Sequence, residues 1–151
     1  MEEKQNKVPF PQANDFNKII KIIEIDDEDK LLDTGFLLDY LELGTQRQIS
    51  YYVSAAEFLG IIDKSRRFTI FGNELRDSIY ESRVLKLCQR IVSLPVFGEI
   101  FFMQYLYKEV VDTNYISQMI SDIYGIDNVE VCNRRASTVK KWLLWVDGNK
   151  L

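Results

Sequence analysis

The sequence contains no histidine, only two cysteines among 151 residues, and no apolar run long enough to span a bilayer. Without histidine, the common catalytic triads, histidine metal sites and histidine-dependent metal nucleases are excluded. Cys88 and Cys132 match no metal-ligand spacing, no glycine-rich phosphate loop is present, and no signal peptide opens the chain. We therefore expect a cytoplasmic protein with no membrane partner, no metal, no cofactor and no enzyme activity of its own.

What the chain does contain is enough apolar sequence for a core and an uneven distribution of charge. Hydrophobic residues make up 46% of it, and the net charge is −4. Five acidic residues lie within residues 24–29, and without them the net charge would be +1. Basic residues cluster at 64–67 and 134–141. Because a local basic face matters more for DNA binding than the total charge, an acidic chain can still bind nucleic acid.

Residues 44–67 (GTQRQISYYVSAAEFLGIIDKSRR) organise the whole interpretation. Thr45 is a plausible N-cap, and a helix of 3.6-residue period follows it, which Gly60 ends. The apolar positions of this helix are Ile49, Tyr52, Val53, Ala56 and Leu59. Two short apolar segments, 61–62 and 68–70, flank the basic turn and read as strands. Helix, strand, basic turn and strand together predict the second half of a winged helix-turn-helix.

The remaining chain has a similar order of elements. Apolar periodicity predicts further helices over residues 16–24, 31–43, 71–93, 96–108, 115–124 and 128–146. The run 31–43 could be one helix, or a turn at Thr34-Gly35 followed by a helix. We expect an N-terminal arm (1–14), a first winged-helix unit (15–80) and a second winged-helix-like unit (81–151) whose final wing is short or absent. The predicted fold class is mainly α with a short β-hairpin wing, the two units being joined by the long helix 71–93.

Polar faces of two helices predict DNA contacts. In a helix-turn-helix, the second helix lies in the major groove, where Arg reads guanine and Gln or Asn reads adenine. Hydroxyl groups suit phosphate contacts, and basic wing residues suit the backbone or minor groove. Gln48 belongs with the base-reading candidates. The predicted DNA-binding residues are Thr45, Gln46, Arg47, Ser50, Tyr51, Ser54, Lys64, Arg66, Arg67, Asn133, Arg134, Arg135, Ser137, Thr138 and Lys141. The alternative is that they form an ordinary solvated helix face.

One segment is superficially similar to a nuclease site. Glu28-Asp29-Lys30, with Asp15 upstream, resembles the acidic-x-lysine metal site of many restriction nucleases. That site requires strands in a sheet, whereas this segment lies at a predicted helix junction. We therefore expect no catalytic residues in this chain.

Several motifs carry a family resemblance that covers nearly the whole chain. They are Phe10-Pro11-Gln12, Arg47-Gln48 with Tyr51-Tyr52, Leu59-Gly60-Ile61-Ile62, and Arg134-Arg135-Ala136-Ser137-Thr138-Val139 with Trp142-Leu143 and Trp145-Val146. Together they resemble tandem winged-helix modules found alone or fused to nucleases in bacterial restriction–modification systems. The resemblance implies sequence-specific binding of double-stranded DNA, with a nuclease domain or subunit as a possible partner. The missing final wing departs from the complete pattern. A protein-interaction module and a transcriptional regulator remain the alternatives, and the oligomeric state stays open.

Overall fold

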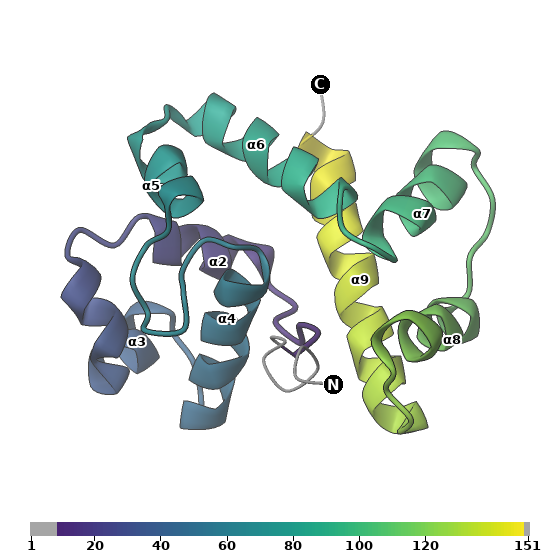
Figure 1. The fold of residues 1–151 in the computed structure, drawn as a ribbon, viewed down its shortest axis with the longest axis horizontal. Helices are drawn as coiled ribbons and strands as arrows, with labels where there is room; N and C mark the ends of the chain where they lie inside the picture. Colours follow the sequence, from purple (N-terminus) through teal and green to yellow (C-terminus); the bar gives the residue numbers. More distant parts are fainter. Residues whose placement is uncertain (1–8, 150–151) are drawn as a thin grey trace. The chain divides into compact units, whose positions relative to one another are not determined.

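The computed structural model describes residues 9–149, which form two compact units (Figure 1). The first unit contains residues up to Ala13 and Asn17–Asp77, and the second contains Asn14–Phe16 and the chain from Ser78 onward. Residues 1–8 of the predicted arm lie outside the described part. In chain order the elements are α2 (Phe16–Ile23), η1 (Glu28–Leu32), α3 (Thr34–Tyr40), α4 (Gln46–Phe58), α5 (Ile70–Asp77), α6 (Tyr80–Val92), α7 (Phe97–Phe101), η2 (Phe102–Leu106), α8 (Thr113–Tyr124) and α9 (Val129–Asn149).

Helix α4 forms where the sequence predicts it. The Thr45 side chain accepts a hydrogen bond from the Gln48 amide at 3.3 Å, which confirms Thr45 as the N-cap. The helix ends just before Gly60, whose φ of 79° is easily adopted only by glycine. All five predicted apolar positions are buried, so the predicted inner face is confirmed. Helix α3 lies beside α4 in the first unit, and a short turn joins them (Figure 1).

The predicted β-hairpin wing is wrong. Across residues 9–149 the structure has no strand, and a single antiparallel bridge joins Ile62 to Phe68. The Phe68 amide, which a second strand would need for pairing, donates instead to the Glu28 carboxylate at 2.7 Å. The next residue, Thr69, immediately precedes α5, and its hydroxyl accepts from the Gly72 amide in the first turn of that helix at 3.0 Å. Neither unit is therefore a winged-helix unit in the described residues.

Gly72 allows α5 to lie close to the segment that was expected to form the wing. A Cβ atom at this position would lie 2.1 Å from the Ile61 carbonyl oxygen, so no larger residue fits without a backbone shift. The Thr69 amide donates to the same carbonyl at 3.0 Å. The chain thus turns from the bridge straight into α5.

The predicted long helix over residues 71–93 is two helices, and this prediction was wrong as well. Helix α5 ends at Asp77 and α6 begins at Tyr80. Between them Ile79 is extended, with φ −66° and ψ 162°. Arg83 donates to the carbonyl oxygen of Ser78 at 3.3 Å, so this group is satisfied outside any helix.

The chain also resolves the alternatives left open for residues 31–43. The 3₁₀ helix η1 ends at Leu32, and α3 starts at Thr34 with Asp33 as its N-cap. The Asp33 carboxylate accepts from the Phe36 amide at 3.0 Å. Neither alternative is correct, because residues 31–43 do not form one helix and Thr34-Gly35 are the first two residues of α3 and not a turn.

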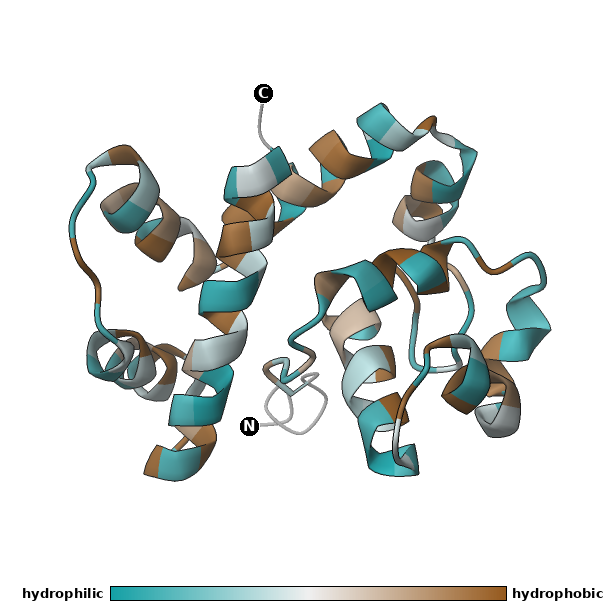
Figure 2. Cartoon of the chain, turned by 180° about the vertical axis from the view of Figure 1, so that it is seen from behind, coloured by the Kyte–Doolittle hydropathy of each residue, from teal (hydrophilic) through white to brown (hydrophobic). Residues whose placement is uncertain are grey.

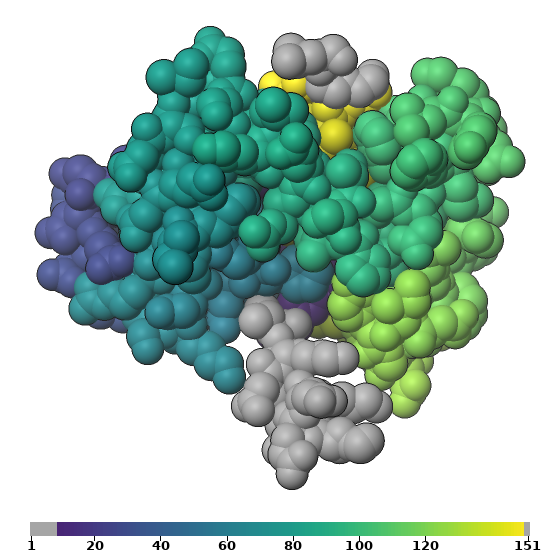
Figure 3. Space-filling view, turned by 45° about the horizontal axis from the view of Figure 1, so that its top comes forward, coloured from purple at the N-terminus to yellow at the C-terminus, as the bar shows by residue number. Residues whose placement is uncertain are grey.

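The second unit packs α6, α7 and α8 against the long helix α9. In the space-filling view, the surfaces of α6 and α7 adjoin (Figure 3). Asp112 caps α8, and Gly125 ends it with a left-handed φ of 70°. The fully buried Trp142 stacks on Phe97 with 5.3 Å between ring centroids, and Phe16 contacts its edge at 5.2 Å. The predicted helix 96–108 begins as α7 and continues as the π-helix η2.

No helix between residues 9 and 149 is both long enough and apolar enough to cross a membrane.

Candidate nucleic-acid interface

The first turns of α4 present a polar surface opposite the buried stripe. Gln46, Arg47 and Ser50 are exposed, whereas Tyr51 and Ser54 are half-buried. Figure 2 shows the N-terminal end of α4 as hydrophilic. The Arg47 side chain makes no hydrogen bond or ion pair with any residue that the structure describes. Its guanidinium is therefore available to an external acceptor.

Two polar side chains at this end are engaged in holding the helix start. Thr45 accepts from the Gln48 amide, and the Gln48 side-chain oxygen accepts from the Gly44 amide at 2.8 Å. This reciprocal pair satisfies backbone donors that an α-helix leaves unpaired. The side-chain carbonyl of Gln48 is thus committed within the protein, while its amide nitrogen remains a donor.

Two cations of the basic turn that follows α4 already have acceptors within the protein. Arg66 donates to the Leu31 carbonyl oxygen at 2.9 Å. Arg67 pairs with Asp29 at 2.6 Å and with Glu28 at 3.2 Å. Hydrogen bonds to these carboxylates, Asp29 first, raise the pKa of Arg67. Lys64 is exposed and has no such bond to any described residue.

The second predicted surface, on α9, is less open. Arg134 and Lys141 are exposed, but Asn133, Arg135 and Ser137 are half-buried. Arg134 and Arg135 already have interactions within the protein. The conditions for an external contact are therefore less favourable here than at Arg47.

Thr138 cannot meet DNA, so its predicted phosphate contact is wrong. Its side chain is 0% exposed, and its hydroxyl donates to the Asn14 side-chain oxygen at 2.6 Å. The helical spacing could have predicted that Thr138 is buried, because it stands one helical turn before the buried Trp142 and next to the buried Val139. Because threonine is polar, we had assigned it to the exposed face of the helix and not to the buried face.

The segment similar to a nuclease site lies in the 3₁₀ helix η1, and its charges are paired. Lys30 contacts Asp26 at 3.0 Å, while Glu28 and Asp29 hold Arg67. Within residues 9–149 no group of three or more His, Cys, Asp or Glu side chains is arranged to hold a metal ion. Cys88 and Cys132 are both buried free thiols. The paired carboxylates act as a clamp on the basic turn.

Fold and surface together define a class: a helical protein of two compact units, each with a shorter helix joined by a short turn to a longer, partly exposed one. Residues 18–149 match the model of a domain family of unknown function, DUF7226, and the chain belongs to this family. No curated protein and no solved structure matches the chain.

Proposed function

We propose that this protein binds double-stranded DNA in a sequence-specific manner through the exposed N-terminal half of α4. The observation that carries this proposal is Arg47, a solvent-exposed guanidinium in the first turn of a helix, with no bond to any other described residue. A guanidinium can make two parallel hydrogen bonds to a guanine edge, and neighbouring Gln46 can do the same with adenine. Ser50 lies one turn further along and suits a phosphate oxygen.

The contacts that hold α4 in the first unit keep its exposed N-terminal half rigid. Ile49, Val53 and Ala56 anchor the opposite face of α4 in the core. The Thr45 and Gln48 bonds hold its first turn in place. A helix N-terminus also carries partial positive charge, which favours the approach of a phosphate. This arrangement needs no wing, and Arg66 and Arg67, which already have acceptors within the protein, are not part of it.

We further propose that DNA binding serves target recognition for a cytoplasmic restriction endonuclease or related defence protein, with a nuclease domain or subunit as partner. The support for this is the motif resemblance around Arg47-Gln48 and Tyr51-Tyr52. Electrophoresis of plasmid DNA mixed with magnesium and this chain alone tests whether cleavage requires the nuclease partner. We expect no cleavage without it.

The DNA proposal is tested by selecting duplexes from a random pool at low salt and measuring binding to the selected site and to random duplex. Arg47→Ala should weaken binding to the selected site by about 1–3 kcal/mol. Arg47→Lys keeps the charge and loses the two-pronged donor, so it should lower the preference for the selected site while leaving binding to random duplex nearly unchanged. Circular dichroism of each variant checks that α4 remains folded.

Two results would overturn the proposal: no shift of any duplex at low salt, or full retention of sequence preference in both Arg47 variants. The alternative is then a protein-interaction module. A specific feature favours that alternative, since Phe102, Leu106, Tyr107 and Val110 leave apolar surface exposed in and after η2, with Val110 98% exposed. Large exposed apolar patches commonly mark protein-binding surfaces.

A further inference from the structure

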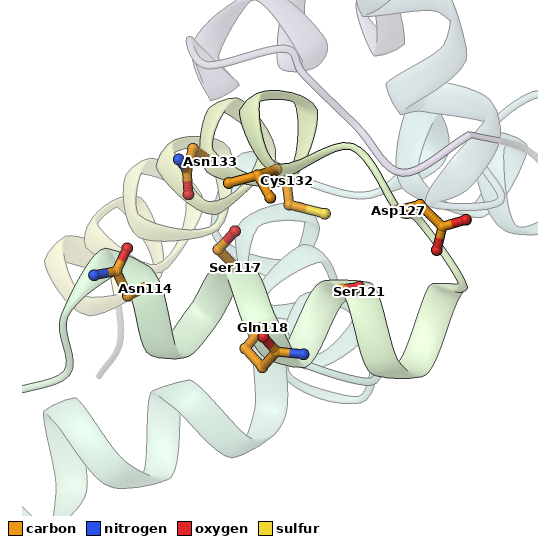
Figure 4. A pocket seen from close by; sticks show the side chains of 8 residues that line it. Asn114, Ser117, Gln118, Ser121, Asp127, Cys132 and Asn133 are labelled. Carbon is orange, nitrogen blue, oxygen red and sulfur yellow. The ribbon is translucent and has the colours of Figure 1, made fainter.

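A small polar pocket lies between α8 and α9 in the second unit (Figure 4). Its volume is about 220 Å³. Ser117 and Gln118 line it from α8, Cys132 and Asn133 from α9, and Asp127 and Val129 from the turn and the start of α9. Gln118 donates to Asp122 at 2.9 Å, and Cys132 donates to the Ile126 carbonyl oxygen at 3.5 Å, so these two side chains are already engaged.

Two polar groups in the pocket remain available to bind a ligand. The Asn133 side-chain oxygen is buried, and no described residue donates a hydrogen bond to it. Ser117 is only 7% exposed, and its hydroxyl lies on the side of α8 that faces Asn133 (Figure 4). A buried polar atom without a partner costs free energy, so native structures normally provide such an atom with a water or a ligand.

We propose that this pocket binds an uncharged nitrogen heterocycle of the nucleobase class. The primary amide of Asn133 carries a donor and an acceptor side by side, which pair with a heterocycle edge that carries both, as asparagine does with adenine. The Ser117 hydroxyl supplies a third bond. The volume corresponds to about seven water molecules, which is enough for one small ring system.

The charges of the residues that line the pocket disfavour anionic ligands. No lysine or arginine is among the residues that line the pocket, and Asp127 is acidic, so a phosphate or carboxylate ligand is disfavoured. An exocyclic amino group, as in cytosine or adenine, would be favoured near Asp127. Val129 and Cys132 supply apolar wall for the ring faces.

The same chemistry could come from a free base or from a base unstacked out of a single strand. The experiment is a nitrogen–proton correlation NMR titration of the labelled full chain with cytosine and with adenine, and separately with single-stranded oligodeoxynucleotides. Inorganic phosphate and benzene are the control probes. We expect saturable shifts of the Ser117, Gln118 and Asn133 amides with the bases and none at these positions with the control probes. Shifts with free bases identify a small-molecule site, and shifts with oligonucleotides alone identify an extruded base.

Two variants and a matched control test the assignment of the residues. Asn133→Ala should weaken base binding by about tenfold or more, and Ser117→Ala by about fivefold, because each removes hydrogen bonds to the ring. Asn73→Ala changes an exposed asparagine of α5 in the first unit and should change nothing.

The proposal is overturned if neither base nor oligonucleotide gives saturable shifts up to about 10 mM, since the pocket then holds only water. Equal shifts with phosphate or benzene overturn the ligand class. Because the wild-type titration stands without the variants, a variant that fails to fold leaves the proposal testable. The pocket does not depend on Arg47, so its failure and the failure of duplex binding are separate results.

Discussion

Tyr124 is the last residue of α8, and the fold makes its phenol group harder to ionise. Its hydroxyl donates to the Pro95 carbonyl oxygen at 3.4 Å. Burial, with a smaller effect from the negative charge of Glu99, raises the pKa of Tyr124 to about 12. The folded protein therefore holds this phenol proton at a pH where the unfolded chain has lost it.

This difference makes stability depend on pH. The stabilisation linked to Tyr124 is fully present below the unfolded pKa of about 10 and is lost as the pH rises through about 12. Since the ring is only half-buried, we expect about 1 kcal/mol after allowance for solvent screening. In thermal melts, Tyr124→Phe should therefore gain stability relative to wild type between pH 9 and pH 12. The exposed Tyr107→Phe serves as control; an equal gain in that variant would contradict the assignment.

At the scale of the element, the start of α6 is poorly capped. Ile79 occupies the N-cap position, is 72% exposed, and provides no side-chain hydrogen bond to the first turn. The preferred N-cap residues are Ser, Thr, Asp and Asn, because their oxygens accept from amides that the helix leaves unpaired. The break before α6 is therefore held by the bonds to Ser78 and not by a cap.

Ile79→Asp should stabilise the protein by about 1 kcal/mol, because the carboxylate accepts from first-turn amides and complements the helix dipole. Little apolar burial is lost at such an exposed position. This corresponds to a rise in melting temperature of about 2–4 °C for a chain of this size. Ile79→Ala removes the same side chain without adding an acceptor, and should not be stabilising. Equal melting temperatures for the two variants would contradict this account of the helix start.

At the scale of the whole molecule, charge limits how the protein can meet DNA. The net charge is −4, and several cations are already paired with carboxylates, among them Lys30 and Arg67. Arg47 and Lys64 are exposed and have no such partner in the described part of the chain. Duplex binding through these residues would use few phosphate contacts, so its salt dependence should be shallow.

We expect Lys64→Ala to weaken binding to all duplexes alike and to reduce the slope of log affinity against log salt by about 1, because one phosphate contact is lost. Lys30→Ala removes a lysine that is already paired with Asp26, and should leave the slope unchanged. Fluorescence anisotropy between 50 and 200 mM salt measures both. If both variants change the slope equally, the effect comes from overall charge and not from a contact by Lys64.

The helix faces and caps could be predicted because neighbours in sequence decide them. The buried stripe of α4, the Thr45 cap and the helix end at Gly60 depend on residues within a few positions of one another. The same local reasoning failed at the break between α5 and α6. There the Ser78 hydroxyl accepts from Lys86, and its carbonyl accepts from Arg83, and apolar periodicity does not register such bonds.

By itself, the sequence determined which residues face inward along α4 and where most helices begin and end, since helical period and capping are short-range effects. Only the tertiary structure decided the fate of the wing and of Thr138. The Phe68 amide bonds a carboxylate 40 positions away, and the Thr138 hydroxyl bonds a side chain 124 positions away. Pairings at such separations depend on how the whole chain packs. For the same reason, only the structure separates Arg47, which has no acceptor among the described residues, from Arg66 and Arg67, which already have acceptors within the protein.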